Sequence, residues 1–212
     1  MAVKTNREYR TFRVPVDIRR ASEGEEGSCI VDGYASTYEP YVLFSDKTTD
    51  YCERIEPGAF DEADISDVIF LYNHQGMVYA RVKNSTLKLT VDEKGLHVWA
   101  DLGSTEESRK MFEAIESGLV DEMSFAFTVA EDEYEEEKGK ITRVVKRVAK
   151  VYDVSAVSIP ANPDTNIEAV SARSAFDGEI ERRKAERLER EKVLELAKAK
   201  YEFLRKKENC YA

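Results

Sequence analysis

The spacing of the strand-like segments constrains the fold most, because they follow one another closely without a regular alternation of strand and helix. Residues 9–16 alternate apolar and polar side chains, as a half-buried strand does. Similar segments occupy residues 29–38, 68–72, 78–82, 87–91, 96–102, 123–129 and 141–159, the last being one strand or two broken near 149–150. A doubly wound sheet needs a helix between successive strands, so this spacing favours a mainly β fold with flanking helices (α+β) and a barrel or closed sheet.

Few segments before residue 172 have helical character. Residues 56–63 are expected to form a short helix. Ser104 or Thr105 is placed to cap a second helix that ends near Gly118, a favourable residue just past a helix C-terminus. Residues 39–50 have the composition of a loop, and the acidic run 131–137 is expected at an exposed hairpin tip, where it acts as a solvated loop or in electrostatic recognition.

The charge of the chain is unevenly distributed and suggests two parts. The 212 residues carry a formal net charge of −10, yet residues 172–212 hold 12 basic and 9 acidic residues, a net charge of +3. Helix-favouring residues with oppositely charged pairs at helical spacing fill this segment from about 175 to 207. We therefore expect a folded domain over residues 1–171 and a charged helical tail over residues 172–212. The tail is either a solvated helix or a segment that docks on a partner or is removed.

Composition also excludes several classes of function. A net charge of −10 argues against direct binding of nucleic acid. The three cysteines, Cys29, Cys52 and Cys210, are widely spaced and lack any zinc-binding pattern, so neither a metal nor a cofactor is expected. No apolar run approaches the ~18 residues of a membrane span, and the first residues lack the apolar core of a signal peptide. A reduced, cytosolic setting and no contact with membranes follow as expectations.

A base, a hydroxyl and a carboxylate appear in order along the chain, each beside strand-like residues: His74, Ser124 and Asp153. Serine is a weak nucleophile that needs an adjacent base, and histidine serves because its ordinary pKa lies near neutral pH. The other histidine, His97, lies on an alternating hairpin strand and is expected at the surface or rim. The residues alone leave open whether His74 and Ser124 form a nucleophilic site or are structural members of their strands.

Four blocks around these residues resemble motifs of the prohead (capsid maturation) proteases of tailed bacteriophages. They occur in the same order as in that family and together span roughly residues 10–170, which makes the match specific. The blocks are ERIEPGAF at residues 53–60, LYNH at 71–74, GLVDEMSFAF at 118–127 and DVSAVSIPANP at 153–163.

The resemblance implies a serine endopeptidase with a fold like that of herpesvirus assemblin, a closed β-barrel flanked by helices. It places the histidine at His74 and the nucleophile at Ser124. Assemblin relatives use a second histidine after the serine, but no histidine follows Ser124 here. Asp153, where the family usually has an acid, is therefore the candidate for the third residue. Donors for the oxyanion are expected from the loop 160–162 and from backbone near Ser124.

The resemblance also implies partners and a place of action. The expected substrates are a scaffold protein or the scaffolding region of the major capsid protein, together with the enzyme itself, inside the assembling prohead in the host cytoplasm. A homodimer is implied by resemblance only. Two departures affect the expected pocket: Ala126 replaces a glycine, and residues 78–81 differ from the usual Pro-Leu-Gly-Arg/Lys.

Two alternatives remain beside the protease. One is a catalytically inactive capsid-assembly or scaffold protein that retains the protease fold, which the charged tail and the acidic run would suit equally well. The other is a small-molecule esterase, against which the absence of a GxSxG motif counts.

Overall fold

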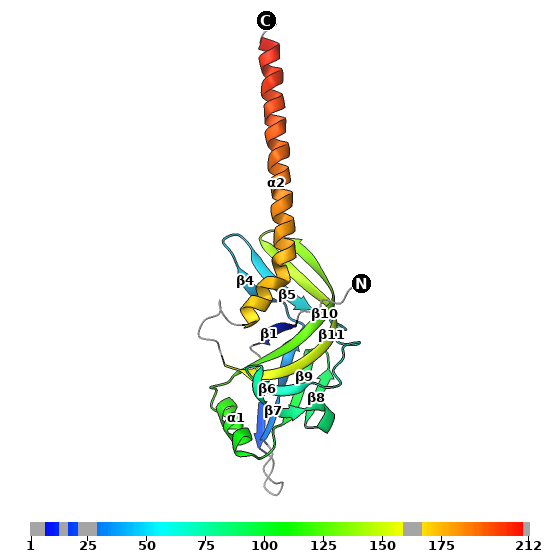
Figure 1. Ribbon diagram of the computed structural model, residues 1–212, viewed down its shortest axis with the longest axis vertical. Helices are drawn as coiled ribbons and strands as arrows, with labels where there is room; N and C mark the ends of the chain where they lie inside the picture. The colour runs from blue at the N-terminus through cyan, green and yellow to red at the C-terminus, as the bar shows by residue number, and fades with distance from the viewer. Residues whose placement is uncertain (1–6, 13–16, 21–28, 159–166, 210–212) are drawn as a thin grey trace. The chain divides into compact units, whose positions relative to one another are not determined.

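The computed structural model describes residues 7–12, 17–20, 29–158 and 167–209. The chain divides into two compact units, Met1–Ala172 and Arg173–Ala212. The first unit contains two β-sheets and a short helix, and the second continues the long C-terminal helix (Figure 1). The fold is thus mainly β with two helices, as the strand spacing predicted.

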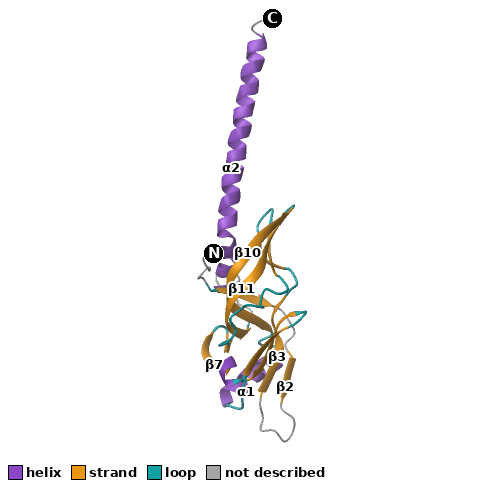
Figure 2. Cartoon of the chain, turned by 90° about the vertical axis from the view of Figure 1, so that its right-hand side faces the viewer, coloured by secondary structure: helices purple, strands orange, loops and turns teal. Residues whose placement is uncertain are grey.

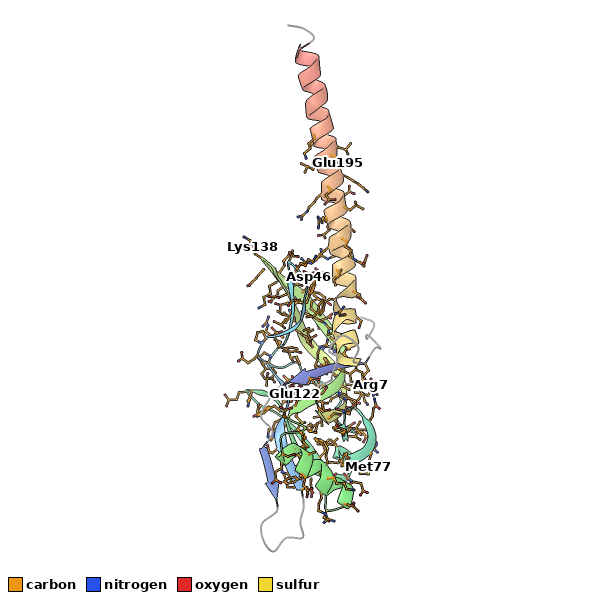
Figure 3. The ribbon with its side chains drawn as sticks, turned by 90° about the vertical axis from the view of Figure 1, so that its left-hand side faces the viewer. Arg7, Asp46, Met77, Glu122, Lys138 and Glu195 are labelled. Carbon is orange, nitrogen blue, oxygen red and sulfur yellow. The ribbon has the colours of Figure 1, made fainter. Side chains whose placement is uncertain are left out.

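The larger sheet is built around two long antiparallel strands, β10 (Glu122–Glu137) and β11 (Lys140–Val157). Its strand order is β1-β10-β11-β5-β4, with β6 also paired to β11 and β7 paired to β6. Strand β11 pairs in parallel with β5 along its first half and with β6 along its second. Glu122 at the start of β10 and Lys138 at the hairpin turn are labelled in Figure 3. The remaining bounds are β1 (Glu8–Phe12), β4 (Tyr41–Ser45), β5 (Asp50–Ile55), β6 (Ile69–Tyr72) and β7 (Gln75–Arg81).

The second sheet has four antiparallel strands in the order β2-β3-β9-β8. They are β2 (Asp17–Arg20) and β3 (Cys29–Thr37), labelled in Figure 2, and β8 (Leu87–Val91) and β9 (Gly95–Asp101), labelled in Figure 1. Gly95, in the turn predicted between β8 and β9, has φ +154, and a Cβ there would lie 2.1 Å from the carbonyl oxygen of Ser36. Only glycine permits the backbones to approach so closely. A single turn of 3₁₀ helix (Val82–Asn84) joins β7 to β8.

Helix α1 (Glu106–Glu116) follows the second sheet and is capped as predicted. The Thr105 side chain accepts a hydrogen bond from the Ser108 backbone N–H at 3.1 Å, and two acids occupy the first turn, where they complement the helix dipole. Met111, Phe112 and Ile115 are buried in a hydrophobic cluster that also takes residues from both sheets. Helix α2 (Ile167–Asn209) supplies the predicted helical tail, beginning earlier than expected.

The structure corrects several sequence predictions. Residues 39–50 are not all loop, because β4 and the first residue of β5 lie there; Tyr41 to Phe44 form an apolar run without alternation, which gave no strand signal beside the polar residues that follow. No helix forms over residues 56–63, where Gly58 at φ +90 interrupts a series of turns. The acidic run 131–137 is largely exposed, as expected, but it belongs to β10 itself, and the hairpin turn follows it.

Within the described ranges, the strand pairings form two separate sheets and do not close into a barrel. The closed barrel is unconfirmed and stays a prediction.

Candidate active site

Strand register places Ser124 and Asp153 on one face of the larger sheet. Ser124 on β10 lies opposite Ser155 on β11, and Ala126 lies opposite Asp153. Side chains alternate between faces along a strand, and residues directly opposite each other share a face. The intervening pair, Phe125 and Val154, is buried in the hydrophobic core on the other face.

His74 comes from the tight turn between β6 and β7. Tyr72 pairs with Gln75, so the turn has two central residues, Asn73 at φ 48 and His74 at φ 58. Positive φ at both central residues is the geometry of hairpin turns that match the twist of the strands. Asparagine tolerates this region well, whereas histidine in the second position, where glycine is usual, is an uncommon choice.

Hydrogen bonds tie this turn to β11 and the residue after it. The Asn73 backbone N–H donates to the Ala156 carbonyl at 3.1 Å, and the Asn73 side-chain oxygen accepts from the Ser158 backbone N–H at 3.2 Å. The His74 backbone N–H donates to Ser155 Oγ at 3.2 Å. The turn is thereby held beside β11.

The imidazole of His74 bridges the other two predicted residues. Its Nε2 lies 2.7 Å from Ser124 Oγ, and its Nδ1 lies 2.5 Å from Asp153 Oδ1. An ionised carboxylate only accepts hydrogen bonds, which assigns the ring proton to Nδ1 and leaves Nε2 free to accept the Ser124 proton. The three residues singled out from the sequence thus lie in the order that a nucleophile, a base and an orienting acid require. Their catalytic roles stay predictions.

The three side chains are buried. Ser124 is fully covered, Asp153 is 3% exposed and the His74 side chain 5%. Electrostatic interactions in such surroundings are screened less than in water. For another molecule to contact Ser124 Oγ, neighbouring groups would have to move aside.

Two contacts of His74 were not predicted from the sequence. Tyr9 of β1 places its ring edge-on to the imidazole, with ring centroids 4.8 Å apart. Ser155 Oγ lies 3.0 Å from Asp153 Oδ1 and 3.2 Å from His74 Nδ1. The two-residue spacing from Asp153 along a strand places Ser155 on the same face and is a signal that could have identified it. No local signal marks Tyr9.

Glu53, the first acid of the ERIEPGAF block, lies in a buried ionic cluster. Its carboxylate accepts from Arg10 at 2.5 and 2.9 Å, from Arg143 at 2.8 Å and from the Tyr41 hydroxyl at 2.6 Å. Burial alone would raise the pKa of Glu53, but the two guanidinium charges and the hydrogen bonds outweigh it and lower the pKa to about 2. Glu8 completes the pairing by accepting from both arginines. The cluster fixes β1, which carries Tyr9, to the centre of the sheet.

The end of the same block packs beneath the strand that carries the serine. Phe60 is buried, and its ring meets that of Phe125 in an edge-on contact with centroids 6.1 Å apart. The block therefore contributes to the support of the site through Glu53 and Phe60.

The remaining site predictions have mixed outcomes. His97, expected at the surface or rim, has a side chain that is 28% exposed and pairs with Asp32 at 2.7 Å. The loop 160–162, expected to supply oxyanion donors, lies outside the described residues. Within those residues, no group of three or more His, Cys, Asp or Glu side chains could hold a metal ion. Over the same ranges, no helix is long and apolar enough to cross a bilayer.

Fold and site together define an α+β protein with a Ser–His–Asp arrangement on the face of a sheet. The family model of the caudovirus prohead serine proteases matches residues 15–178. This chain belongs to that family.

A relative from another phage agrees with this membership. The prohead protease of Enterobacteria phage HK97 is 28% identical over 160 residues, which are 74% of this chain and 65% of the relative. The chain therefore spans slightly less than two thirds of that protein's length. A solved structure of the bacteriophage T4 capsid assembly protease, gp21, matches 72% of this chain and 99% of its own with a TM-score of 0.47 and 10% identity. A likeness that slight carries no argument.

Proposed function

We propose that this chain is a serine endopeptidase that cleaves capsid-assembly proteins during maturation of a phage prohead. The observation that carries the proposal is the imidazole of His74, held between Ser124 Oγ at 2.7 Å and Asp153 Oδ1 at 2.5 Å. Membership of a family of prohead serine proteases supports both the reaction and its setting.

The reaction follows from this geometry. Ser124 Oγ attacks the scissile carbonyl carbon while His74 Nε2 takes its proton, and Asp153 stabilises the resulting imidazolium through Nδ1–H. His74 then gives the proton to the leaving amine, which departs and leaves an acyl-enzyme on Ser124. Water, deprotonated by the same nitrogen, hydrolyses the ester and restores the serine. Because Ser124 is fully covered at rest, opening of the site precedes attack.

The proposed substrates are a scaffold protein or the scaffolding region of the major capsid protein, inside the assembling prohead in the host cytoplasm. The chain itself is a further substrate. Its second unit suits self-cleavage, since the side chains described from Glu181 to Lys198 are nearly all exposed. Proteases act on segments that open easily, and a solvated helix held by surface ion pairs opens easily.

Co-expression with the neighbouring capsid gene tests the proposal. The wild-type chain is expected to convert the capsid protein to a shorter product of defined mass, whereas Ser124→Ala leaves it intact, because nucleophile and base act as a unit. Ser36→Ala serves as the control, since Ser36 is equally buried but lies on β3, in the other sheet. Intact-mass spectrometry of both proteins reads the result and also reports any shortening of the protease. Equal cleavage by the wild type and Ser124→Ala would refute the assignment.

One observation favours a second function, an inactive capsid-assembly protein that retains this fold. Ser124 has no exposed surface, as expected of a serine that is only structural. The alignment of all three polar groups counts against this, since a purely structural serine needs neither an imidazole at 2.7 Å nor an acid behind it. Absence of cleavage in the wild-type co-expression would favour the inactive protein.

A further inference from the structure

We propose that Ser155 is a positioning residue of this site, whose hydroxyl holds both the backbone of His74 and the carboxylate of Asp153. The proposal rests on the proposed function, since it concerns how the same three groups are aligned. Ser155 is fully covered and lies directly opposite Ser124 across the β10–β11 pair.

Three contacts converge on the single oxygen of Ser155. It lies 3.0 Å from Asp153 Oδ1, 3.2 Å from the His74 backbone nitrogen and 3.2 Å from His74 Nδ1. The hydroxyl therefore contacts His74 at two points and Asp153 at one.

The donors and acceptors balance in one way. A serine hydroxyl has one proton to donate and two lone pairs that accept. The carboxylate can only accept, so the Ser155 proton goes to Asp153 Oδ1. The backbone N–H of His74 can only donate, so it fills one lone pair of Ser155. The Nδ1–H of His74 then points to the nearer acceptor, Asp153 Oδ1 at 2.5 Å.

This pattern also excludes Ser155 as the nucleophile. The Ser155 proton is donated to the carboxylate of Asp153, and the ring nitrogen of His74 that contacts Ser155, Nδ1, carries the ring proton in the same arrangement. Nε2, the nitrogen that can accept a proton, faces Ser124 instead.

The backbone contact matters because His74 has φ 58, a conformation that a non-glycine residue keeps only when its surroundings hold it. Ser155 binds the N–H of that residue from the neighbouring strand. With alanine at position 155, the turn would lose this anchor, and the carboxylate of Asp153 would lose a donor that fixes its rotamer. Both losses would displace the imidazole relative to Ser124 Oγ.

The first test measures the rate at which a fluorophosphonate ester reacts with Ser124 in the full chain, separating the maximal rate from the probe affinity. Ser155→Ala is expected to lower the maximal rate roughly 10- to 100-fold with little change in affinity, as a small misplacement of reacting groups does. Ser155→Thr, which keeps the hydroxyl, is expected to recover most of the rate. Ser36→Ala controls for removal of a buried strand hydroxyl and should react like the wild type.

The second test needs no reaction. The chain has two histidines, so proton NMR with His97→Gln as background isolates the Nδ1–H resonance of His74. A downfield signal is expected in the resting protein, retained in Ser155→Thr and Ser36→Ala and shifted or lost in Ser155→Ala.

The outcomes separate the two proposals. A wild-type chain that reacts while Ser124→Ala does not upholds the nucleophile, and Ser155→Ala reacting at the wild-type rate would then overturn the positioning role alone. If wild type and Ser124→Ala behave alike, the proposed function fails, and the NMR signal still decides whether Ser155 orders the imidazole. An Nδ1–H signal unchanged in Ser155→Ala would overturn it.

Discussion

At the residue scale, the carboxylate of Asp153 determines which nitrogen of His74 carries the proton. Its Oδ1 faces Nδ1 at 2.5 Å inside a covered site, so the neutral ring presents an unprotonated Nε2 to Ser124. The acid has a second donor in Ser155, and this fixes its orientation.

Asp153→Asn tests this role. The amide is similar in size but can donate to Nδ1, which would favour the wrong tautomer, so we expect cleavage of the capsid substrate to slow by about 10³- to 10⁴-fold. Asp67→Asn, at an ion pair with Arg81 and Lys83, controls for the loss of an aspartate charge. A first-order cleavage rate within tenfold of wild type in Asp153→Asn would remove Asp153 from the mechanism.

At the element scale, the backbone conformation of the β6–β7 turn determines where the imidazole of His74 lies. Asn73 and His74 both have positive φ, and the Asn73 side chain bonds to Ser158, the residue that follows β11. The hairpin is therefore held to β11 at the same residues that deliver the imidazole.

Replacing Asn73 separates strain from side-chain bonding. Asn73→Ala loses the side-chain bonds and places at φ 48 a residue that tolerates positive φ less well than asparagine, so it is expected to lower the free energy of unfolding by about 1–3 kcal/mol. Asn73→Gly loses the side-chain bonds but adopts positive φ freely, so it should be more stable than the alanine variant. Urea unfolding of both measures the difference. A glycine variant no more stable than alanine would show that positive φ contributes little.

At the scale of the whole first unit, the buried ionic cluster connects strands distant in sequence. Arg10 of β1 and Arg143 of β11 share Glu53 of β5, and Arg143 also pairs with Asp132 of β10 at 2.7 Å. Removing one member leaves an uncompensated buried charge, which typically costs about 3–5 kcal/mol.

The pKa of Glu53 makes this stabilisation depend on pH. Its pKa falls from 4.5 to about 2 on folding, so the unfolded chain binds the proton more readily. The contribution is complete above pH 4.5 and is lost as the pH falls toward 2. Glu53→Gln should therefore lower the free energy of unfolding at neutral pH. It should also make this free energy fall less steeply between pH 4.5 and pH 2, as denaturant unfolding at several pH values would measure. Glu93→Gln, on the surface, should retain the wild-type pH dependence; an equal slope in all three proteins would contradict the account.

The structure brings together the three candidate residues named from the sequence, whereas sequence reasoning missed most of the residues that support them. His74 and Ser124 drew attention because few other residues could perform chemistry, the resemblance to the prohead proteases assigned their roles and pointed to Asp153, and most strands followed from the pattern of apolar side chains. Arg10 and Arg143 were missed because charged residues are normally exposed, so no pattern predicts their burial. The β6–β7 turn lacks the glycine that marks such turns, and Tyr9 reaches His74 only through the pairing of β1 with β10.

The central claim is that His74 activates Ser124, and the location of a covalent adduct tests it most directly. The intact chain would be treated with a fluorophosphonate and digested, and the modified peptide sequenced by mass spectrometry. We predict one adduct, on Ser124, in the wild type and none on that residue in His74→Ala. Modification of Ser124 to the same extent with and without the imidazole, or an adduct found only on another residue, would contradict the claim.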